Sequence, residues 1–145
     1  MQITWLGHST IYLKTTAGTR ILIDAWIENN PACPPEWHTK LRELGVDIIK
    51  TLWTGSAESF RSVVEGCPAI VALAGGDMGE TLEDYLRMTR EALDVGLGGV
   101  TYGRFVWQHP HTSSVIKALH ALIHQNASVI ESLAVYEADV LAEAQ

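Results

Sequence analysis

Three short apolar runs, separated by segments of helical periodicity, constrain the fold of this chain more than any other feature. The runs are 46–50, 69–73 and 99–102. Strands that alternate with helices in this way pair in parallel through right-handed crossovers. The C-terminal ends of parallel strands meet at one edge of a sheet or barrel, and ligands bind there. The sequence therefore predicts an α/β fold with a ligand site after these runs.

Capping residues and glycines bound the helices between the runs. Ser56 can cap a helix that ends at Gly66. Thr81 and Asp84 resemble a capping box at the start of a helix that stops before Gly96. Further helical patterns lie at 37–44 and, as the last predicted helix, at 115–124.

The N-terminal part has a different pattern. Residues 3–13 are rich in β-branched and aromatic side chains, and a short turn leads to the apolar run 21–23. This pattern predicts a β-meander. Residues 28–35 hold three of the five prolines, which interrupt helices and central strands. We interpret them as a linker between a meander, residues 1–35, and an α/β part, residues 36–145.

Composition excludes several classes of partner. The 145 residues are 47% hydrophobic and 19% charged, which is ordinary for a soluble globular protein. A net charge of -7 with only ten Lys and Arg residues argues against nucleic acid. No apolar run approaches the roughly 20 residues of a transmembrane helix, and no basic leader is present. Cys33 and Cys67 are interpreted as reduced thiols, so we expect a cytoplasmic protein without a membrane partner.

Lys50 ends the first apolar run, an unusual place for a lysine, because burial of an ammonium group is costly unless its charge is paired or lost. Removal from water favours the neutral amine, and a neutral amine can attack a carbonyl carbon. An ordinary solvated or ion-paired lysine fits the same position. The residue pattern alone leaves both interpretations open.

Glycines follow the other two runs. Gly75 and Gly76 come after the second run, and Gly103 with Arg104 after the third. Because glycine has no Cβ atom, backbone N–H groups can approach a phosphate there, and an arginine can add a bidentate contact. A plain tight turn is the more common explanation of a single glycine pair. The occurrence of glycines after successive strands favours an anion site beside Lys50.

Several ordered motifs lie in the α/β part. They are Val46-Asp47-Ile48-Ile49-Lys50-Thr51, Thr54-Gly55 with Phe60, Val64-Glu65-Gly66-Cys67-Pro68, Leu73-Ala74-Gly75-Gly76, Gly103-Arg104-Phe105-Val106-Trp107-Gln108 and Ala118-Leu119-His120-Ala121-Leu122-Ile123-His124. In order and spacing they resemble the C-terminal part of the archaeal-type class I aldolase family. That family includes fructose-bisphosphate aldolase and the thiolase that processes phosphorylated autoinducer-2, and the last motif is similar to the thiolase branch.

The resemblance implies a site and an activity. Lys50 would form the Schiff base, and Gly75, Gly76, Gly103 and Arg104 would hold the substrate phosphate. The implied fold is a partial (β/α)8 TIM barrel, consisting of its last three β-α units. The implied activity is that of an aldolase or thiolase, a carbon-carbon lyase or transferase acting on a small phosphorylated ketose-like substrate. This chemistry calls for no cofactor and no metal.

Residues 3–10 and 20–24 resemble something else, the opening strands of metallo-β-lactamase-like hydrolases. In that family a His-x-His-x-Asp-His motif follows and binds two metal ions. This sequence lacks the motif and passes into the aldolase-like part instead. His8 and Asp24 are therefore interpreted as structural, and a metal-dependent hydrolase is kept as an alternative function.

Two pairs of histidines are interpreted as polar or half-buried positions rather than as metal sites. His109 and His111 lie in a loop interrupted by a proline. His120 and His124 share a helical face at i and i+4, a spacing that can bind metal. No third ligand is evident beside either pair.

The length of the chain sets a limit on its function. A complete (β/α)8 barrel takes about 250 residues, and no positions match the acid-base residues that the earlier strands of these aldolases carry. We therefore expect impaired activity, whether the chain is a natural fusion, a truncation or a designed chimera. A non-catalytic, oligomerising α/β fragment is the other alternative. Open sheet edges favour self-association, so we expect a homo-oligomer.

Overall fold

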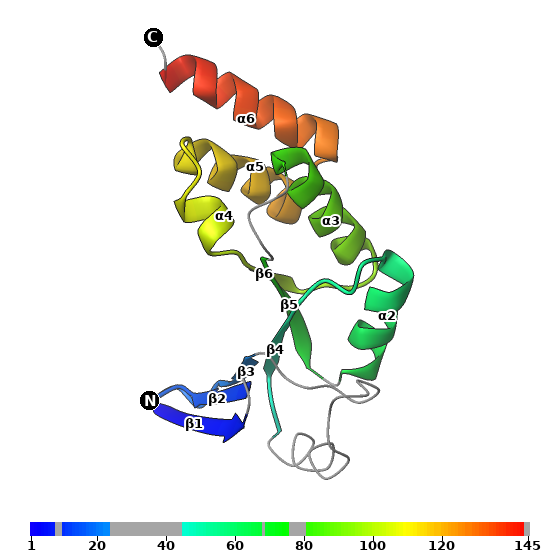
Figure 1. Ribbon diagram of the computed structural model, residues 1–145, viewed down its shortest axis with the longest axis vertical. Helices are drawn as coiled ribbons and strands as arrows, with labels where there is room; N and C mark the ends of the chain where they lie inside the picture. The colour runs from blue at the N-terminus through cyan, green and yellow to red at the C-terminus, as the bar shows by residue number, and fades with distance from the viewer. Residues whose placement is uncertain (8–9, 24–44, 68, 76–80, 144–145) are drawn as a thin grey trace.

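A six-stranded sheet organises the computed structural model (Figure 1), which describes residues 1–7, 10–23, 45–67, 69–75 and 81–143. The strands, adjacent in chain order, are β1 (Gln2–Gly7), β2 (Thr10–Lys14), β3 (Arg20–Ile23), β4 (Ile48–Thr51), β5 (Ile70–Ala74) and β6 (Gly99–Thr101). β1, β2 and β3 are antiparallel neighbours, whereas β3 to β6 are parallel. The predicted α/β class with a parallel sheet is confirmed.

The N-terminal strands form the predicted meander, although residues 3–13 divide into β1 and β2 instead of one extended run. The turn between β2 and β3 is closed by two hydrogen bonds. The Thr15 N–H donates to the Thr19 carbonyl at 2.9 Å, and the Gly18 N–H donates to the Thr15 carbonyl at 3.1 Å. Gly18 has a φ of +94°, which favours glycine at this position of the turn.

The meander and the parallel strands share one sheet. β3 pairs with β4 in parallel, with Ile23 opposite Lys50. Just before β4, the Asp47 N–H donates to the Arg20 carbonyl at 2.8 Å, and the Arg20 N–H donates to the Asp47 carboxylate at 2.6 Å. These bonds hold the approach to β4, which begins two residues later than the predicted run. The sheet thus spans both predicted parts, and their division into two domains stays a prediction.

The helices between the parallel strands begin and end at the predicted signals. Ser56 caps the first helix, and Thr81 and Asp84 form the predicted reciprocal capping box of the second. Gly96, with a φ of +103°, follows the second helix as expected. The helices of the described part are α2 (Ala57–Gly66), α3 (Leu82–Asp94), α4 (Arg104–Trp107), α5 (Thr112–His124) and α6 (Val129–Glu143).

One face of the parallel strands packs against α2 and α3. Val71 and Leu73 of β5 form a buried cluster with Phe60 of α2 and Ala92 of α3. Burial of each large apolar side chain contributes about 1.5 to 3 kcal/mol. Because side chains alternate along a strand, Ala72, which lies between Val71 and Leu73, projects to the opposite face.

A second buried cluster joins α3, α4 and α5, the helices seen above the sheet in Figure 1. Val115, Leu119 and Leu122 of α5 are buried in it, as the helical pattern predicts. The ring of Phe105 from α4 stacks on Tyr85 of α3 at a centroid distance of 3.7 Å. The short α4 is thereby held directly after β6.

Helix α6 corrects the prediction that the helix at 115–124 is the last one. Val129, Leu133 and Tyr136 recur at helical spacing and pack on the second cluster. The Ser128 N–H donates to the Glu131 carboxylate at 2.7 Å, and the Glu131 N–H donates to the Ser128 hydroxyl at 3.2 Å. This reciprocal pair is a capping signal that the sequence contains. Helix α5 also starts three residues earlier than predicted.

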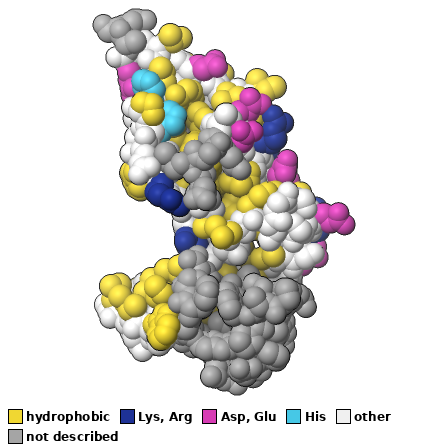
Figure 2. All heavy atoms as spheres, viewed as in Figure 1, with side chains coloured by type: hydrophobic (Ala, Val, Ile, Leu, Met, Phe, Trp, Pro, Cys, Tyr) yellow, Lys and Arg dark blue, Asp and Glu magenta, His cyan; other side chains and the backbone are white. Residues whose placement is uncertain are grey.

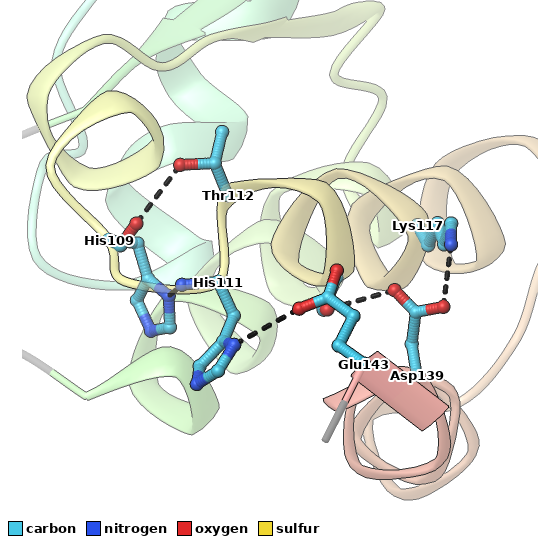
Figure 3. Close-up of polar contacts among 7 residues, drawn as sticks. His109, His111, Thr112, Lys117, Asp139 and Glu143 are labelled. Atoms are coloured by element: carbon cyan, nitrogen blue, oxygen red, sulfur yellow. Dashed lines mark hydrogen bonds and ion pairs between the residues drawn. The ribbon is translucent and has the colours of Figure 1, made fainter. Parts of the chain in front are cut away.

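Polar contacts tie α6 to α5 (Figure 3). Asp139 accepts hydrogen bonds from the Lys117 ammonium and from the buried Ser114 hydroxyl, the latter at 2.8 Å. At the end of α6, the Glu143 carboxylate lies 3.2 Å from His111 Nδ1. The bonds from Lys117 and then Ser114 lower the pKa of Asp139 below its usual value.

Asp139→Asn is expected to destabilise the protein at pH 7. Because the carboxylate has a lower pKa in the folded state, its contribution is present above the unfolded pKa, near 4, and is lost as the pH falls through the folded value. Urea midpoints of the two proteins should therefore differ at pH 7 and converge toward pH 3. A constant difference across this range would contradict the assignment. Glu137→Gln, an exposed carboxyl on the same helix, is the control.

Two features of the sequence lie outside the described residues, the linker at 28–35 and the helix at 37–44. Among the helices that the structure describes, none combines the length and apolar character needed to cross a membrane.

Candidate functional site at the ends of the parallel strands

The C-terminal ends of β4, β5 and β6 meet at one edge of the sheet, as predicted. Lys50 lies opposite Ala72 on β5, and Ala72 lies opposite Gly99 on β6. The segments that begin at Gly75 and Gly103 therefore leave the sheet at the same edge, a short distance beyond the Lys50 row.

Lys50 projects from the face that α2 and α3 do not cover. Its neighbour Ile49 packs with Leu22 on the opposite face, and alternation along β4 sends Lys50 the other way. In the same row, Lys50 lies between Ile23 on β3 and Ala72 on β5, and Gly99 on β6 lies beyond Ala72. Ala72 has only a methyl group, and Gly99 has no side chain. This leaves space on the flank of a partly exposed lysine.

The loop after Lys50 is anchored to α2. The Trp53 ring packs on Phe60 at a centroid distance of 5.1 Å. The hydroxyls of Thr54 and Ser59 lie 2.8 Å apart, and the Ser59 N–H donates to the Ser56 cap at 3.2 Å. These contacts fix the first loop at the edge of the site, so the end of β4 has a defined position.

The predicted phosphate-binding residues have different surroundings. A Cβ atom on Gly75 would lie 3.3 Å from Cδ1 of Tyr102, so close packing accounts for this glycine. Gly103 has open space around its Cα atom, and Arg104 is exposed at the start of α4. Gly76 lies outside the described residues. Phosphate binding by these four residues stays a prediction.

Tyr102 joins the ends of β5 and β6 to α3, a role that no motif in the sequence signals. The buried Thr89 hydroxyl donates to the Tyr85 carbonyl at 2.6 Å. Since its single proton is used there, the Tyr102 hydroxyl donates to Thr89 Oγ1, also at 2.6 Å. The Tyr102 ring meets Tyr85 edge-on at a centroid distance of 5.4 Å and also packs closely beside Gly75.

A shallow cavity of about 310 Å³ lies beside β6, between its last residues and helices α4 and α5. Trp107, Ile116, His120 and His124 contribute to its largely apolar wall. The rings of His120 and His124 have centroids 4.9 Å apart. Among the residues that the structure describes, no group of three or more His, Cys, Asp or Glu side chains is arranged to hold a metal ion.

His109 and His111 are brought together at the start of α5. The His111 N–H donates to His109 Nδ1 at 3.1 Å. Burial, and then the charge of His111, lower the pKa of His109 below its usual value, which keeps this imidazole neutral at pH 7. The pair contacts the Tyr136 ring of α6, with centroid distances of 5.6 and 6.3 Å, and thus helps to dock that helix.

The part of the chain that holds Lys50 and these glycines is similar to known aldolases. Residues 38–109 match the family described as DeoC/LacD family aldolase. The chain is 42% identical over 91 residues to an uncharacterized aldolase of Saccharolobus solfataricus. It is 40% identical over 92 residues to a 2-amino-3,7-dideoxy-D-threo-hept-6-ulosonate synthase of Halobacterium salinarum. The resemblance of this part to class I aldolases is confirmed.

Solved structures that are similar to this chain are also aldolases. An archaeal fructose-1,6-bisphosphate aldolase, with its catalytic Lys covalently bound to the carbinolamine intermediate of the substrate, is 30% identical with a TM-score of 0.55. The likeness covers 60% of this chain and 36% of that one, which confirms the fold of a partial barrel. Both curated aldolase relatives are covered over 34% of their length, so this chain spans about a third of them.

A separate similarity concerns hydrolases. Over 47 residues the chain is 49% identical to a metal-dependent hydrolase of Roseiflexus sp., and the match covers 19% of that relative. This similarity accords with the hydrolase-like pattern of the N-terminal strands. The two predicted structural residues of that pattern, His8 and Asp24, lie outside the described residues.

Tyr102→Phe is expected to lower the free energy of unfolding by about 0.5 to 1.5 kcal/mol, because it removes the hydrogen bond to Thr89 and leaves the ring packing in place. Urea unfolding at pH 7 measures the change. Tyr136→Phe, which keeps the ring contacts of that residue with His109 and His111, should change stability less. Equal changes in the free energy of unfolding for the two variants would show that the Tyr102 hydroxyl does not stabilise the protein through Thr89.

Proposed function

We propose that the aldolase-like part of this chain binds a small phosphorylated carbonyl compound and forms an imine with it through Lys50. The observation that carries the proposal is the placement of Lys50 in a row with Ala72 and Gly99, on the sheet face that α2 and α3 do not cover. On the β5 side, where Ala72 and Gly99 are small, a carbonyl carbon can approach the amine without meeting a large side chain, whereas Ile23 lies on the β3 side.

The proposed chemistry follows from the amine. The nitrogen lone pair of the Lys50 amine forms a bond to the carbonyl carbon, and a proton passes from that nitrogen to the carbonyl oxygen to give a carbinolamine. Loss of water breaks the carbon-oxygen bond and leaves the imine. Once protonated, the imine accepts the electron pair of the adjacent breaking carbon-carbon bond, which is the step of an aldolase. The comparisons support the aldolase class, and the substrate and this role of Lys50 are proposals.

Arg104 is proposed to bind the substrate phosphate together with backbone N–H groups near Gly75, Gly76 and Gly103. Arg104 is exposed and lies three residues after the end of β6, and Gly103 has open space at its Cα atom. A guanidinium group matches the geometry of a phosphate with two parallel hydrogen bonds. The phosphate would hold the carbonyl compound at the same edge of the sheet as Lys50. The proposed reaction needs no cofactor, and we propose a cytoplasmic location for the protein.

We expect low turnover from this chain. Carbon-carbon cleavage also requires a group that removes the proton of the substrate hydroxyl, and no residue matches the acid-base positions of the aldolase family. A missing general acid or base reduces the rate by roughly 10² to 10⁴. Imine formation is therefore a more direct test of the site than steady-state cleavage.

Borohydride in the presence of dihydroxyacetone phosphate is expected to trap the imine on Lys50. Proteolysis and mass spectrometry would locate the added mass. Lys14 and Lys117, both exposed, and Lys40 serve as internal controls in the same sample. Proximity to a bound phosphate should make modification of Lys50 at least about tenfold greater than that of the controls.

Lys50→Met should remove this adduct without adding label elsewhere. Labelling that spreads evenly over the lysines, or that persists in the variant, would show that the site lacks a Schiff-base lysine. The same measurement with dihydroxyacetone, which lacks the phosphate, separates reactivity of the amine from binding of the anion. Trapping that is equal for both compounds would locate the phosphate away from this edge.

Arg104→Ala is expected to weaken binding of inorganic phosphate or dihydroxyacetone phosphate by about 1.5 to 3 kcal/mol, the contribution of a charge-assisted hydrogen bond. Isothermal titration at low ionic strength measures the affinity. Arg61→Ala, an exposed arginine on α2, removes the same charge away from the site. Equal losses in the two variants would indicate a nonspecific charge effect instead of a phosphate site at Arg104.

A further inference from the structure

Two rows of side chains cross the sheet on the face opposite to α2 and α3. In the first row, Leu13, Ile21 and Ile48 lie between Ile3 on β1 and Ile70 on β5. Every member of this row is aliphatic. This face therefore has an aliphatic row that extends over five strands. The helices α2 and α3 pack on the other face and do not cover it.

The second row runs beside the first, through Trp5, Ile11, Ile23, Lys50 and Ala72. Lys50 is the only ionisable residue in the two rows. In Figure 2, hydrophobic side chains gather over the region of β1 and β2 at the lower left. We call the residues that the two rows contribute from β1, β2 and β3 the meander patch: Ile3, Trp5, Ile11, Leu13, Ile21 and Ile23.

The two rows expose an apolar area that approaches the size of a stable interface. Ile3, Trp5 and Ile70 are 62%, 72% and 57% exposed, and the other aliphatic members on β2, β3 and β4 are partly exposed. Together they leave roughly 500 to 800 Å² of apolar area in contact with water, at or above the largest patch of an ordinary monomer. A stable interface buries about 800 Å² on each partner.

We propose that a second copy of this chain covers the meander patch, face to face, about a two-fold axis that runs parallel to the strands above β2. Two sheets that pack on apolar faces lie about 10 Å apart with their strands nearly aligned. An isologous contact of this kind needs a single self-complementary patch. Flat rows of Ile, Leu and Trp provide it, because every residue of the meander patch other than Trp5 is aliphatic.

The charged side chains of the described strands lie outside the meander patch, although the chain has a net charge of -7. Lys14 and Arg20 alternate with the patch residues along β2 and β3 and so lie on the other face, where Arg20 pairs with Asp47 at 3.4 Å. With the axis above β2, Lys50 lies two strands away, and the two copies of Lys50 are about 20 Å apart. Such a separation exceeds the Debye length at physiological salt, so repulsion between them is weak.

Sedimentation velocity of the whole chain, from about 1 to 300 μM, tests the proposal. We expect a reversible monomer-dimer equilibrium. Trp5→Glu should raise the dissociation constant by roughly 100-fold, because it places a charge in a buried hydrophobic contact. Ile130→Glu introduces the same charge at an exposed residue of α6, outside the patch, and should leave the dimer intact. Circular dichroism and urea midpoints establish that both variants are folded.

A chemical cross-link identifies the face directly. Leu13 lies beside the proposed axis. In a Leu13→Cys variant, a short bismaleimide should therefore join two copies through this position, and peptide mapping would identify the cross-linked residue. Ile130→Cys should give no such product. A monomer at all concentrations, a dimer unaffected by Trp5→Glu, or equal cross-linking at both positions would overturn the proposal. The Lys50→Met variant should still form the dimer, because the interface does not depend on the amine. The dimer proposal is therefore tested independently of the imine proposal.

Discussion

The register of β4 between β3 and β5 is the constraint on which the arrangement of this protein depends. Side chains alternate between the faces of a strand, so a slip of one residue would exchange Lys50 with Ile49. Ile49 would then leave the cluster with Tyr12 and Leu22, and an ammonium group would enter it. The backbone and carboxylate bonds between Arg20 and Asp47 act just before β4 and oppose such a slip. The N-terminal meander therefore helps to present the lysine.

Local signals predicted the fold well wherever a short segment determines its own structure. Thr81 and Asp84 form the expected capping box, and the glycine at 96 has the positive φ that ends a helix. The division of residues 3–13 into two strands could not be predicted in the same way, because both strands share one β-branched and aromatic composition. Helix α6 is predictable from Ser128 and Glu131, because these two residues have the spacing of a reciprocal capping pair.

The candidate site was predictable to a smaller extent, since it depends on contacts between distant segments. The pattern of apolar runs placed Lys50 at a strand end, and the strand register puts it on the open face. Nothing in the sequence indicates that Tyr102 bridges Thr89 and Gly75, residues that lie 13 and 27 positions away from it in the chain. Gly75 illustrates the difficulty, because a glycine required by packing and a glycine that binds phosphate look alike in a sequence.

The sheet face that presents Lys50 is also the most apolar unprotected surface among the described strands. In a closed barrel such rows face the interior, where side chains from the remaining strands fill the space. This chain has an antiparallel hairpin beside its parallel strands, so the same rows meet water at Ile3 and Trp5. Coverage of the meander would relieve that exposure and still leave the ends of β4, β5 and β6 open at the edge. An amine site and a hydrophobic contact can thus share one face because they occupy different strands of it.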